Sequence, residues 1–222
     1  MATALIAGAS GLIGSHLLEQ LLESSEYGRV IAVGRRPLER VHPKLVPVVA
    51  DFAALDKTTV DLRCDDAFCC LGSTIKRAGS AENFRAVDHG AVLALAWAAR
   101  RNGASRFFLV SALGADASSR FLYNRVKGET EEALQVLGFS TLGIFRPSLL
   151  LGPRREFRPG ERISAVILWL AEPLLLGRLR PYRAIRAEVV ARAMLRCSFG
   201  RPGQGVLIFR SDEIQDLGTA RD

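Results

Sequence analysis

The chain has 222 residues, 49% of them hydrophobic and 24% charged, which is the composition of an ordinary globular protein. A chain of this length buries roughly 70% of its unfolded surface, so it needs neither disulfides nor a metal ion to fold. The formal net charge of +7 fits either a solvated basic surface or attraction to an anionic ligand. Because the basic residues are scattered and follow no nucleic-acid-binding motif, we expect no nucleic-acid partner.

The first residues and the longest apolar run bear on the location of the protein. Met1–Ala7 lacks the basic start of a secretory signal peptide and runs straight into a glycine-rich segment. The apolar run Ile163–Leu176 is interrupted by Glu172 and Pro173, and it is shorter than the ~18 residues that a membrane span needs. We therefore expect a cytoplasmic protein without a membrane span.

The cysteines show no spacing typical of a metal site or of a disulfide framework. They are Cys64, Cys69, Cys70 and Cys197. We expect buried free thiols, as in a reducing compartment, and no metal site.

Short apolar runs alternate along the chain with stretches of helical periodicity. The runs that predict strands are Ala2–Ala7, Arg29–Val33, Leu45–Ala50, Ala67–Leu71, Arg106–Val110, Thr141–Phe145 and Val206–Phe209. The stretches that predict helices are Leu12–Glu23, Ala81–Arg101, Ser119–Leu137, Ile163–Leu170 and Ala187–Ser198. This alternation predicts an α/β fold of the Rossmann type: a doubly wound parallel sheet in a single domain over residues 1–222, with a small C-terminal extension.

Three glycines, Gly8, Gly11 and Gly14, lie between the first predicted strand and the first predicted helix. In such a motif one glycine permits a tight turn, one lets the backbone approach a pyrophosphate, and one lets the helix pack closely on the strand. The helix N-terminus then offers free N–H groups and a positive dipole end to the phosphates. The alternative is a glycine turn with a structural role alone. The residues predicted to bind the pyrophosphate are Gly8, Ser10, Gly11, Leu12, Ile13 and Gly14.

The end of the second predicted strand bears on the choice of dinucleotide. An NAD-binding protein places Asp or Glu about 20 residues after the glycine loop, where the carboxylate binds the ribose hydroxyls. Here Arg35 and Arg36 follow Gly34 instead. Arginine binds a 2′-phosphate through charge-assisted hydrogen bonds, so NADP(H) is favoured over NAD(H). The alternative is an ordinary basic loop after a strand.

Tyr123 and Lys127 are four residues apart on a predicted helix and therefore share one face. With the glycine loop, Phe68–Gly72, Ser111–Asp116 and Phe145-Arg146-Pro147, they carry a resemblance that extends over most of the chain. The chain resembles the short-chain dehydrogenase/reductase superfamily in its atypical, NAD(P)-binding branch.

The resemblance implies an oxidoreductase that transfers a hydride between a nicotinamide and a carbonyl or alcohol substrate. Tyr123 would act as acid and base, because the Lys127 ammonium favours a phenolate in a side chain whose ordinary pKa is about 10. Ser111 would bind the same substrate oxygen, and Lys127 would hold the nicotinamide ribose. Residues 147–222 would contribute most of the substrate side. Further cofactor contacts are expected at Asp51, Phe52, Cys70, Leu71, Gly72, Tyr123, Lys127, Pro147 and Leu150, although several of these also fit a purely structural role.

The chain departs from the superfamily pattern at Asp88, where many relatives have an asparagine that supports a proton relay through water. Asp88 could order the same water with different protonation and geometry, which leaves the relay open. The adjacent His89 is expected on the helix surface or packed. An alternative function therefore stays open, namely an NADP(H)-binding regulatory or partner-binding protein with little or no turnover. The substrate, the direction of reaction and the oligomeric state do not follow from the sequence.

Overall fold

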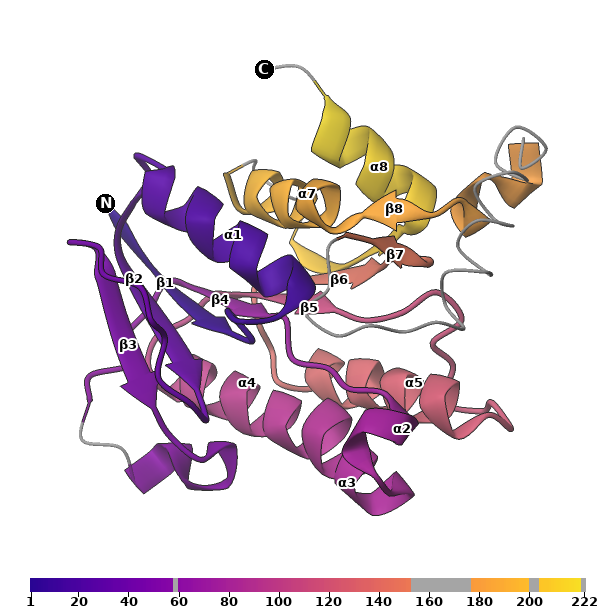
Figure 1. Ribbon diagram of the computed structural model, residues 1–222, viewed down its shortest axis with the longest axis horizontal. Helices are drawn as coiled ribbons and strands as arrows, with labels where there is room; N and C mark the ends of the chain where they lie inside the picture. The colour runs from indigo at the N-terminus through magenta and orange to yellow at the C-terminus, as the bar shows by residue number, and fades with distance from the viewer. Residues whose placement is uncertain (58–59, 153–176, 200–203, 221–222) are drawn as a thin grey trace.

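The computed structural model describes residues 1–57, 60–152, 177–199 and 204–220 (Figure 1). Seven strands of these residues form one parallel sheet in the order β3-β2-β1-β4-β5-β6-β9. The strands are β1 (Ala2–Ala7), β2 (Tyr27–Gly34), β3 (Leu45–Val49), β4 (Asp66–Cys69), β5 (Arg106–Val110), β6 (Thr141–Arg146) and β9 (Gly205–Arg210). The strand order reverses between β1 and β4, as in a doubly wound Rossmann sheet.

Helices cover both faces of the sheet (Figure 1). On one face lie α1 (Leu12–Glu23), α7 (Ala187–Phe199) and α8 (Ser211–Thr219), and α7 packs against both of the others. On the other face lie α2 (Ile75–Ala78), α3 (Ala81–Arg85), α4 (Val92–Arg101) and α5 (Leu122–Gln135). Each face has its own apolar core, one centred on Leu17, Phe68 and Val190 and the other on Ile31, Leu95 and Phe107. The predicted α/β Rossmann architecture is therefore confirmed.

Most predicted strands and helices agree with the structure to within a few residues, and three differences matter for the site. The fourth strand ends at Cys69 rather than Leu71. The predicted helix Ala81–Arg101 is divided into α3, a π-helix η2 (Ala86–Ala91) and α4. The helix predicted from Ser119 begins only at Leu122, because residues 116–121 form a hydrogen-bonded loop before α5. The helix predicted at 163–170 lies outside the described residues.

Several short elements were not predicted. They are the 3-10 helices η1 (Phe52–Lys57) and η4 (Gly177–Tyr182), the paired strands β7 (Leu150–Leu151) and β8 (Ile185–Arg186), and the helices α2 and α8. Among the described helices, none is long and apolar enough to cross a membrane. All four cysteines are free: Cys64, Cys69 and Cys197 are buried as expected, and Cys70 is only half-buried.

A buried polar cluster ties the strands together at the amino ends of the sheet. The Arg106 guanidinium binds both oxygens of Asp66, at 2.5 and 2.6 Å, and also the main-chain oxygen of Ser198. The Tyr27 hydroxyl donates to Asp66 Oδ2 at 2.6 Å. These contacts join β2, β4, β5 and the end of α7 on the side of the sheet opposite the glycine loop.

Candidate functional site

The loops that follow the carboxyl ends of β1 and β4 diverge at the point where the strand order reverses. Ala7 pairs with Val33 on one side and with Cys69 on the other, and the Cys70 amide donates to the Ala7 carbonyl at 2.9 Å. The glycine loop at Gly8–Gly14 therefore lies between the segments that continue from β2 and β4. In open α/β sheets, ligands bind at this switch point.

The loop can only be built from glycine at two of its positions. Gly8 has a φ of +82°, and a Cβ there would lie 2.5 Å from the main-chain oxygen of Cys70. A Cβ on Gly14 would lie 2.1 Å from the Gly8 carbonyl oxygen, so the first turn of α1 packs directly on the loop. Both contacts involve backbone atoms, which cannot move aside as a flexible side chain would.

The N-terminus of α1 is suited to an anion. Gly11 occupies the N-cap position and supplies no side chain to cap the helix, and the first turn contains no acidic residue. The amides of Leu12, Ile13 and Gly14 thus begin a twelve-residue helix without a side-chain partner. Ser10 is exposed beside them. Free amides, a positive dipole end and a close backbone approach are what a pyrophosphate requires, so these residues fit a dinucleotide.

The predicted 2′-phosphate ligands lie on the neighbouring loop. Arg35 and Arg36 follow β2 directly, and both are exposed. Within the described ranges neither arginine forms an ion pair. The parallel register of β1 and β2 places them at the same edge of the sheet as Gly8. The geometry therefore leaves both guanidinium groups available to an anion at this edge.

Two other predicted cofactor residues have clear structural roles. Asp51, after β3, is exposed and accepts a hydrogen bond from the Ala53 amide at 3.1 Å, which caps η1. Phe52 is buried in the core with Leu55. The sequence allowed either a cofactor contact or a structural role at Asp51 and Phe52, and these contacts show a structural role.

Helix α5 carries the predicted Tyr123 and Lys127 one turn apart. The half-buried Tyr123 ring stacks on Phe84 of α3, with ring centroids 5.5 Å apart and planes inclined by 27°. Lys127 is buried, and its Nζ lies 2.8 Å from Oδ1 of Asp88. Phe84 is completely buried and was not among the predicted residues, although it supports the tyrosine ring.

Asp88 lies in the π-helix η2 and is fully buried. Its second oxygen accepts a hydrogen bond from the Ser73 amide at 2.7 Å. A Cβ added to Gly72 would lie 3.6 Å from both Asp88 Oδ1 and Lys127 Nζ, so the segment after β4 passes beside this ion pair. π-Helical turns occur frequently at functional sites. Half-buried Leu71 and exposed Gly72 thus lie beside the ion pair of Lys127 and Asp88. Their exposure leaves them accessible to a cofactor.

The predicted Ser111 contacts a buried carboxylate. It is buried at the end of β5, and its hydroxyl donates to the carboxylate of Glu131. The Arg146 guanidinium binds both oxygens of the same carboxylate, which is itself buried. Sequence reasoning did not identify Glu131. The available signal was its position four residues after Lys127, on the helix face that carries Tyr123 and Lys127.

Burial and nearby charges shift the pKa values of Lys127 and His89. Burial lowers the pKa of Lys127, but the Asp88 carboxylate opposes it, and the net pKa is raised above its ordinary value. Burial and the nearby Arg85 cation lower the pKa of His89, while Glu129 raises it less. His89 is half-buried, with Nδ1 3.1 Å from Thr130 Oγ1.

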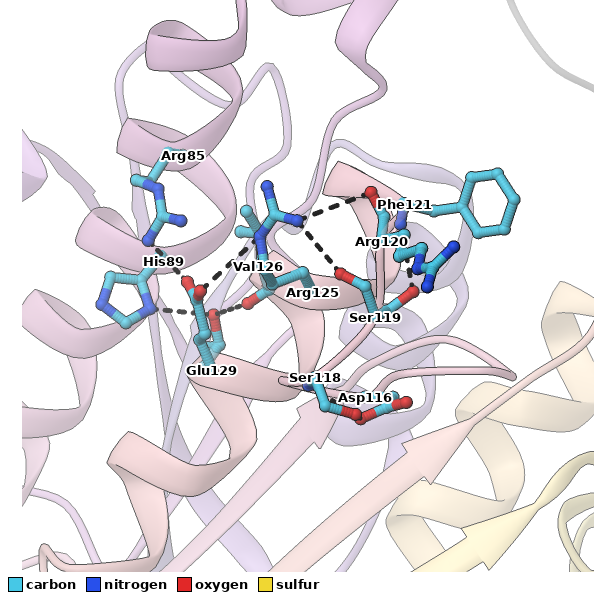
Figure 2. Close-up of polar contacts among 11 residues, drawn as sticks. Arg85, His89, Asp116, Ser118, Ser119, Arg120, Phe121, Arg125, Val126 and Glu129 are labelled. Atoms are coloured by element: carbon cyan, nitrogen blue, oxygen red, sulfur yellow. Dashed lines mark hydrogen bonds and ion pairs between the residues drawn. The ribbon is translucent and has the colours of Figure 1, made fainter.

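The outer face of α5 is held by a cluster of polar side chains, shown in Figure 2. Arg85 Nη1 lies 2.6 Å from Glu129 Oε2, which links α3 to α5. Arg125 contacts Glu129 at 3.9 Å and donates to the Ser119 carbonyl at 3.0 Å. These contacts fix the loop before α5 and therefore the start of the helix that carries Tyr123.

Segments after β6 lie beside the end of β5. Buried Pro147 accepts a hydrogen bond from the Leu113 amide at 2.9 Å, and Leu150 pairs with Ile185 in the small sheet. Of the segment predicted to form the substrate side, residues 153–176 lie outside the described ranges. In those ranges no three His, Cys, Asp or Glu side chains are grouped closely enough to hold a metal ion.

Known proteins match this chain over nearly its whole length. The model of the NAD(P)H-binding family matches residues 8–137. Protein HTATIP2 of Rattus norvegicus is 38% identical over 225 residues, which cover 98% of this chain and 89% of that protein. The mitochondrial protein fmp52 of Aspergillus fumigatus is 36% identical over 200 residues, which cover 87% of this chain and 85% of that protein.

Solved structures are similar in fold. The Bordetella bronchiseptica enzyme WbmH, in complex with NAD+, has a TM-score of 0.68 at 22% identity and covers 95% of this chain and 76% of its own. MoeE5, in complex with UDP-glucose and NAD, has a TM-score of 0.67 at 19% identity and covers 96% of this chain and 79% of its own. The resemblance inferred from the motifs is confirmed: the chain belongs to the NAD(P)H-binding family of Rossmann-fold proteins and is related to HTATIP2.

Proposed function

We propose that the protein is an NADP(H)-dependent oxidoreductase of the short-chain dehydrogenase/reductase type that acts on a carbonyl or alcohol substrate. One observation carries the proposal: Tyr123 stands one turn before a buried, ion-paired Lys127, at the same edge of the sheet as the glycine loop. A tyrosine next to a buried cation can act as an acid and as a base at a site that fits a dinucleotide.

Each end of the cofactor has candidate ligands. The amides that follow Gly11 would bind the pyrophosphate, and the exposed guanidinium groups of Arg35 and Arg36 would bind the 2′-phosphate. The bound nicotinamide supplies or accepts a hydride. Asp51, Phe52, Cys70, Leu71 and Gly72 would border the adenosine half, while Pro147 and Leu150 would border the nicotinamide.

The protein's own residues would move the proton. In reduction the Tyr123 hydroxyl would donate its proton to the carbonyl oxygen of the substrate, and in oxidation it would accept the alcohol proton. The Lys127 ammonium would stabilise the charge that develops on the tyrosine oxygen. Ser111 would offer only lone pairs, because its hydrogen is engaged by Glu131.

The engagement of Ser111 favours a second candidate function. A serine whose hydrogen is engaged by a carboxylate does not polarise a carbonyl, and Asp88 stands where the superfamily that the chain resembles often has asparagine. Both features fit an NADP(H)-binding regulatory or partner-binding protein with little turnover.

The proposed oxidoreductase would form most of its substrate side from residues 147–222. We also propose a cytoplasmic location for it, whereas the fungal fmp52 relatives are named as mitochondrial.

A test of the proposed function compares the wild type with Tyr123→Phe on a panel of carbonyl compounds with NADPH and of alcohols with NADP+. We expect turnover of at least one compound by the wild type and a rate at least roughly 100-fold lower for the variant. NADPH affinity should stay within about threefold, because the substitution removes only a hydroxyl group. Equal rates for the two proteins would contradict the role of Tyr123. No turnover by the wild type, with NADPH bound, would favour the second candidate.

A further inference from the structure

The ion pair between Lys127 and Asp88 is almost completely buried. Their side chains are 5% and 0% exposed, and the charged atoms lie 2.8 Å apart. An isolated buried charge is strongly disfavoured, so either partner alone would lose its charge or reorganise its surroundings. Each charge therefore depends on the other.

The backbone around Asp88 holds its carboxylate in one orientation. The Ser73 amide binds Oδ2 at 2.7 Å, which leaves Oδ1 directed at Lys127. The π-helix η2 carries Asp88, the segment after β4 carries Ser73, and α5 carries Lys127. Three elements thus converge on a single pair of charges, next to the tyrosine that the proposed function uses.

We propose that Asp88 is the counter-ion that holds the Lys127 ammonium in place and thereby positions it for Tyr123 and for a bound cofactor. The counter-ion role stands on the ion pair alone. The consequence for the cofactor rests on the proposed function.

The ionisable groups that act on Lys127 are Asp88, Tyr123 and Cys69. Burial is the largest influence and lowers the pKa of Lys127, while the charge and hydrogen bond of Asp88 raise it. Replacing Asp88 by asparagine preserves the shape of the side chain and removes the charge. Burial then dominates, and Lys127 should lose its proton at a lower pH.

The chain contains only four lysines, so the proton on Lys127 can be followed directly. They are Lys44, Lys57, Lys76 and Lys127. In protein labelled with ¹³C at lysine Cε, the Lys127 signal is assigned by its loss in Lys127→Arg and titrated by NMR. We expect the midpoint in Asp88→Asn to fall by at least about one pH unit relative to the wild type. Glu132→Gln, which removes an exposed carboxylate from α5, should leave the midpoint unchanged. An unchanged midpoint in Asp88→Asn would overturn the proposal.

A second variant covers the case in which Asp88→Asn does not fold. Asp88→Asn combined with Lys127→Met removes both charges, so it should show a cooperative urea transition where Asp88→Asn alone shows none, or one at a higher urea concentration where Asp88→Asn folds. A combined variant no more stable than the single one would contradict the counter-ion role.

The effect on the cofactor is measured by titrating NADPH into wild type and Asp88→Asn at one pH below and one above the lysine midpoint of the variant. We expect Asp88→Asn to lose at least about threefold in affinity between the two pH values, with a smaller change for the wild type. An equal change in NADPH affinity between the two pH values in the wild type and in Asp88→Asn would overturn the proposal that Asp88 positions Lys127 for the cofactor. If the wild type binds no NADPH at all, the proposed function fails, while the lysine titration still decides the counter-ion role.

Discussion

The hydroxyl group of Ser111 donates its hydrogen to Glu131. A serine hydroxyl has one hydrogen, and an ionised carboxylate only accepts hydrogen bonds, so Ser111 has no hydrogen left for a ligand. Arg146 binds both oxygens of Glu131 and keeps the carboxylate turned toward the end of β5. The serine thus presents lone pairs to the site, whereas polarising a carbonyl would require a donor.

Replacing Glu131 by glutamine should destabilise the protein, because it removes the charge that pairs with Arg146 inside the fold. The carboxylate is buried but Arg146 is 27% exposed, so we expect a loss of about 2 kcal/mol in the free energy of unfolding. Urea denaturation measures the loss. The matched control is Glu132→Gln on the exposed side of the same helix, which should cost less than about 0.5 kcal/mol. Equal losses in the two variants would show that the buried pair contributes nothing.

Replacing Arg35 by alanine should weaken NADPH binding far more than NADH binding. A charge-assisted hydrogen bond contributes about 1.5–3 kcal/mol, which corresponds to roughly a ten- to hundredfold change in the dissociation constant. NADH lacks the 2′-phosphate, so its affinity should change by less than about twofold. Calorimetric titrations of both dinucleotides give the comparison, with Arg101→Ala at the exposed end of α4 as the control. Similar losses for NADPH and NADH would contradict the assignment of the 2′-phosphate to Arg35.

Replacing Gly14 by alanine should disrupt the glycine loop, because the added Cβ would lie 2.1 Å from the Gly8 carbonyl oxygen. Relief requires movement of the backbone, and overpacking of this kind costs about 1–3 kcal/mol. We expect that loss in urea denaturation, together with loss of NADPH binding. At Gly34 the nearest atom to an added Cβ is 3.6 Å away, so Gly34→Ala should leave the stability almost unchanged. A Gly14→Ala protein with normal stability and affinity would exclude this loop as the cofactor site.

His89 should make the protein less stable as the pH falls. Its pKa in the folded protein lies below the ordinary value of about 6.5, because burial and the Arg85 cation disfavour the protonated ring. The unfolded chain therefore binds more protons below that pH, so the free energy of unfolding decreases on acidification. His89→Asn should show a smaller decrease between pH 7.5 and pH 5 in urea denaturation. His42→Asn, on the loop before β3, serves as the control. An identical pH dependence of the free energy of unfolding in the wild type and His89→Asn would refute the lowered pKa of His89 as its cause.

The sheet and its main helices could be predicted because their signals are local. Ala4–Ala7 and Phe107–Val110 are buried on both faces of a parallel sheet, so these runs are continuously apolar. The π-helix could not be predicted, since one widened turn leaves the apolar spacing of Ala81–Arg101 nearly intact. Helix α8 is short and has few apolar residues. The Arg210 amide donates a hydrogen bond to Glu213, and a glutamate three residues after the N-cap is a helix-start signal that can be sought in the sequence.

The candidate site also contains some residues that could be predicted from the sequence and others that could not. The glycine loop and the Tyr123–Lys127 pair could be found because each lies within one turn or one loop. The partners of Lys127 and Ser111 come from other elements, and their contacts arise only when β5, β6 and η2 pack around α5. One signal was available for Asp88: a charged residue on the stripe that otherwise contains Phe84, Val92 and Leu95, all buried.

A crystal structure of the protein with NADPH is the most direct test of the proposed site. We predict the pyrophosphate on the amides of the glycine loop, the 2′-phosphate against Arg35, and the nicotinamide ring beside Tyr123 with its ribose bound by Lys127. A dinucleotide bound away from the loop, or a nicotinamide ring far from Tyr123, would contradict it.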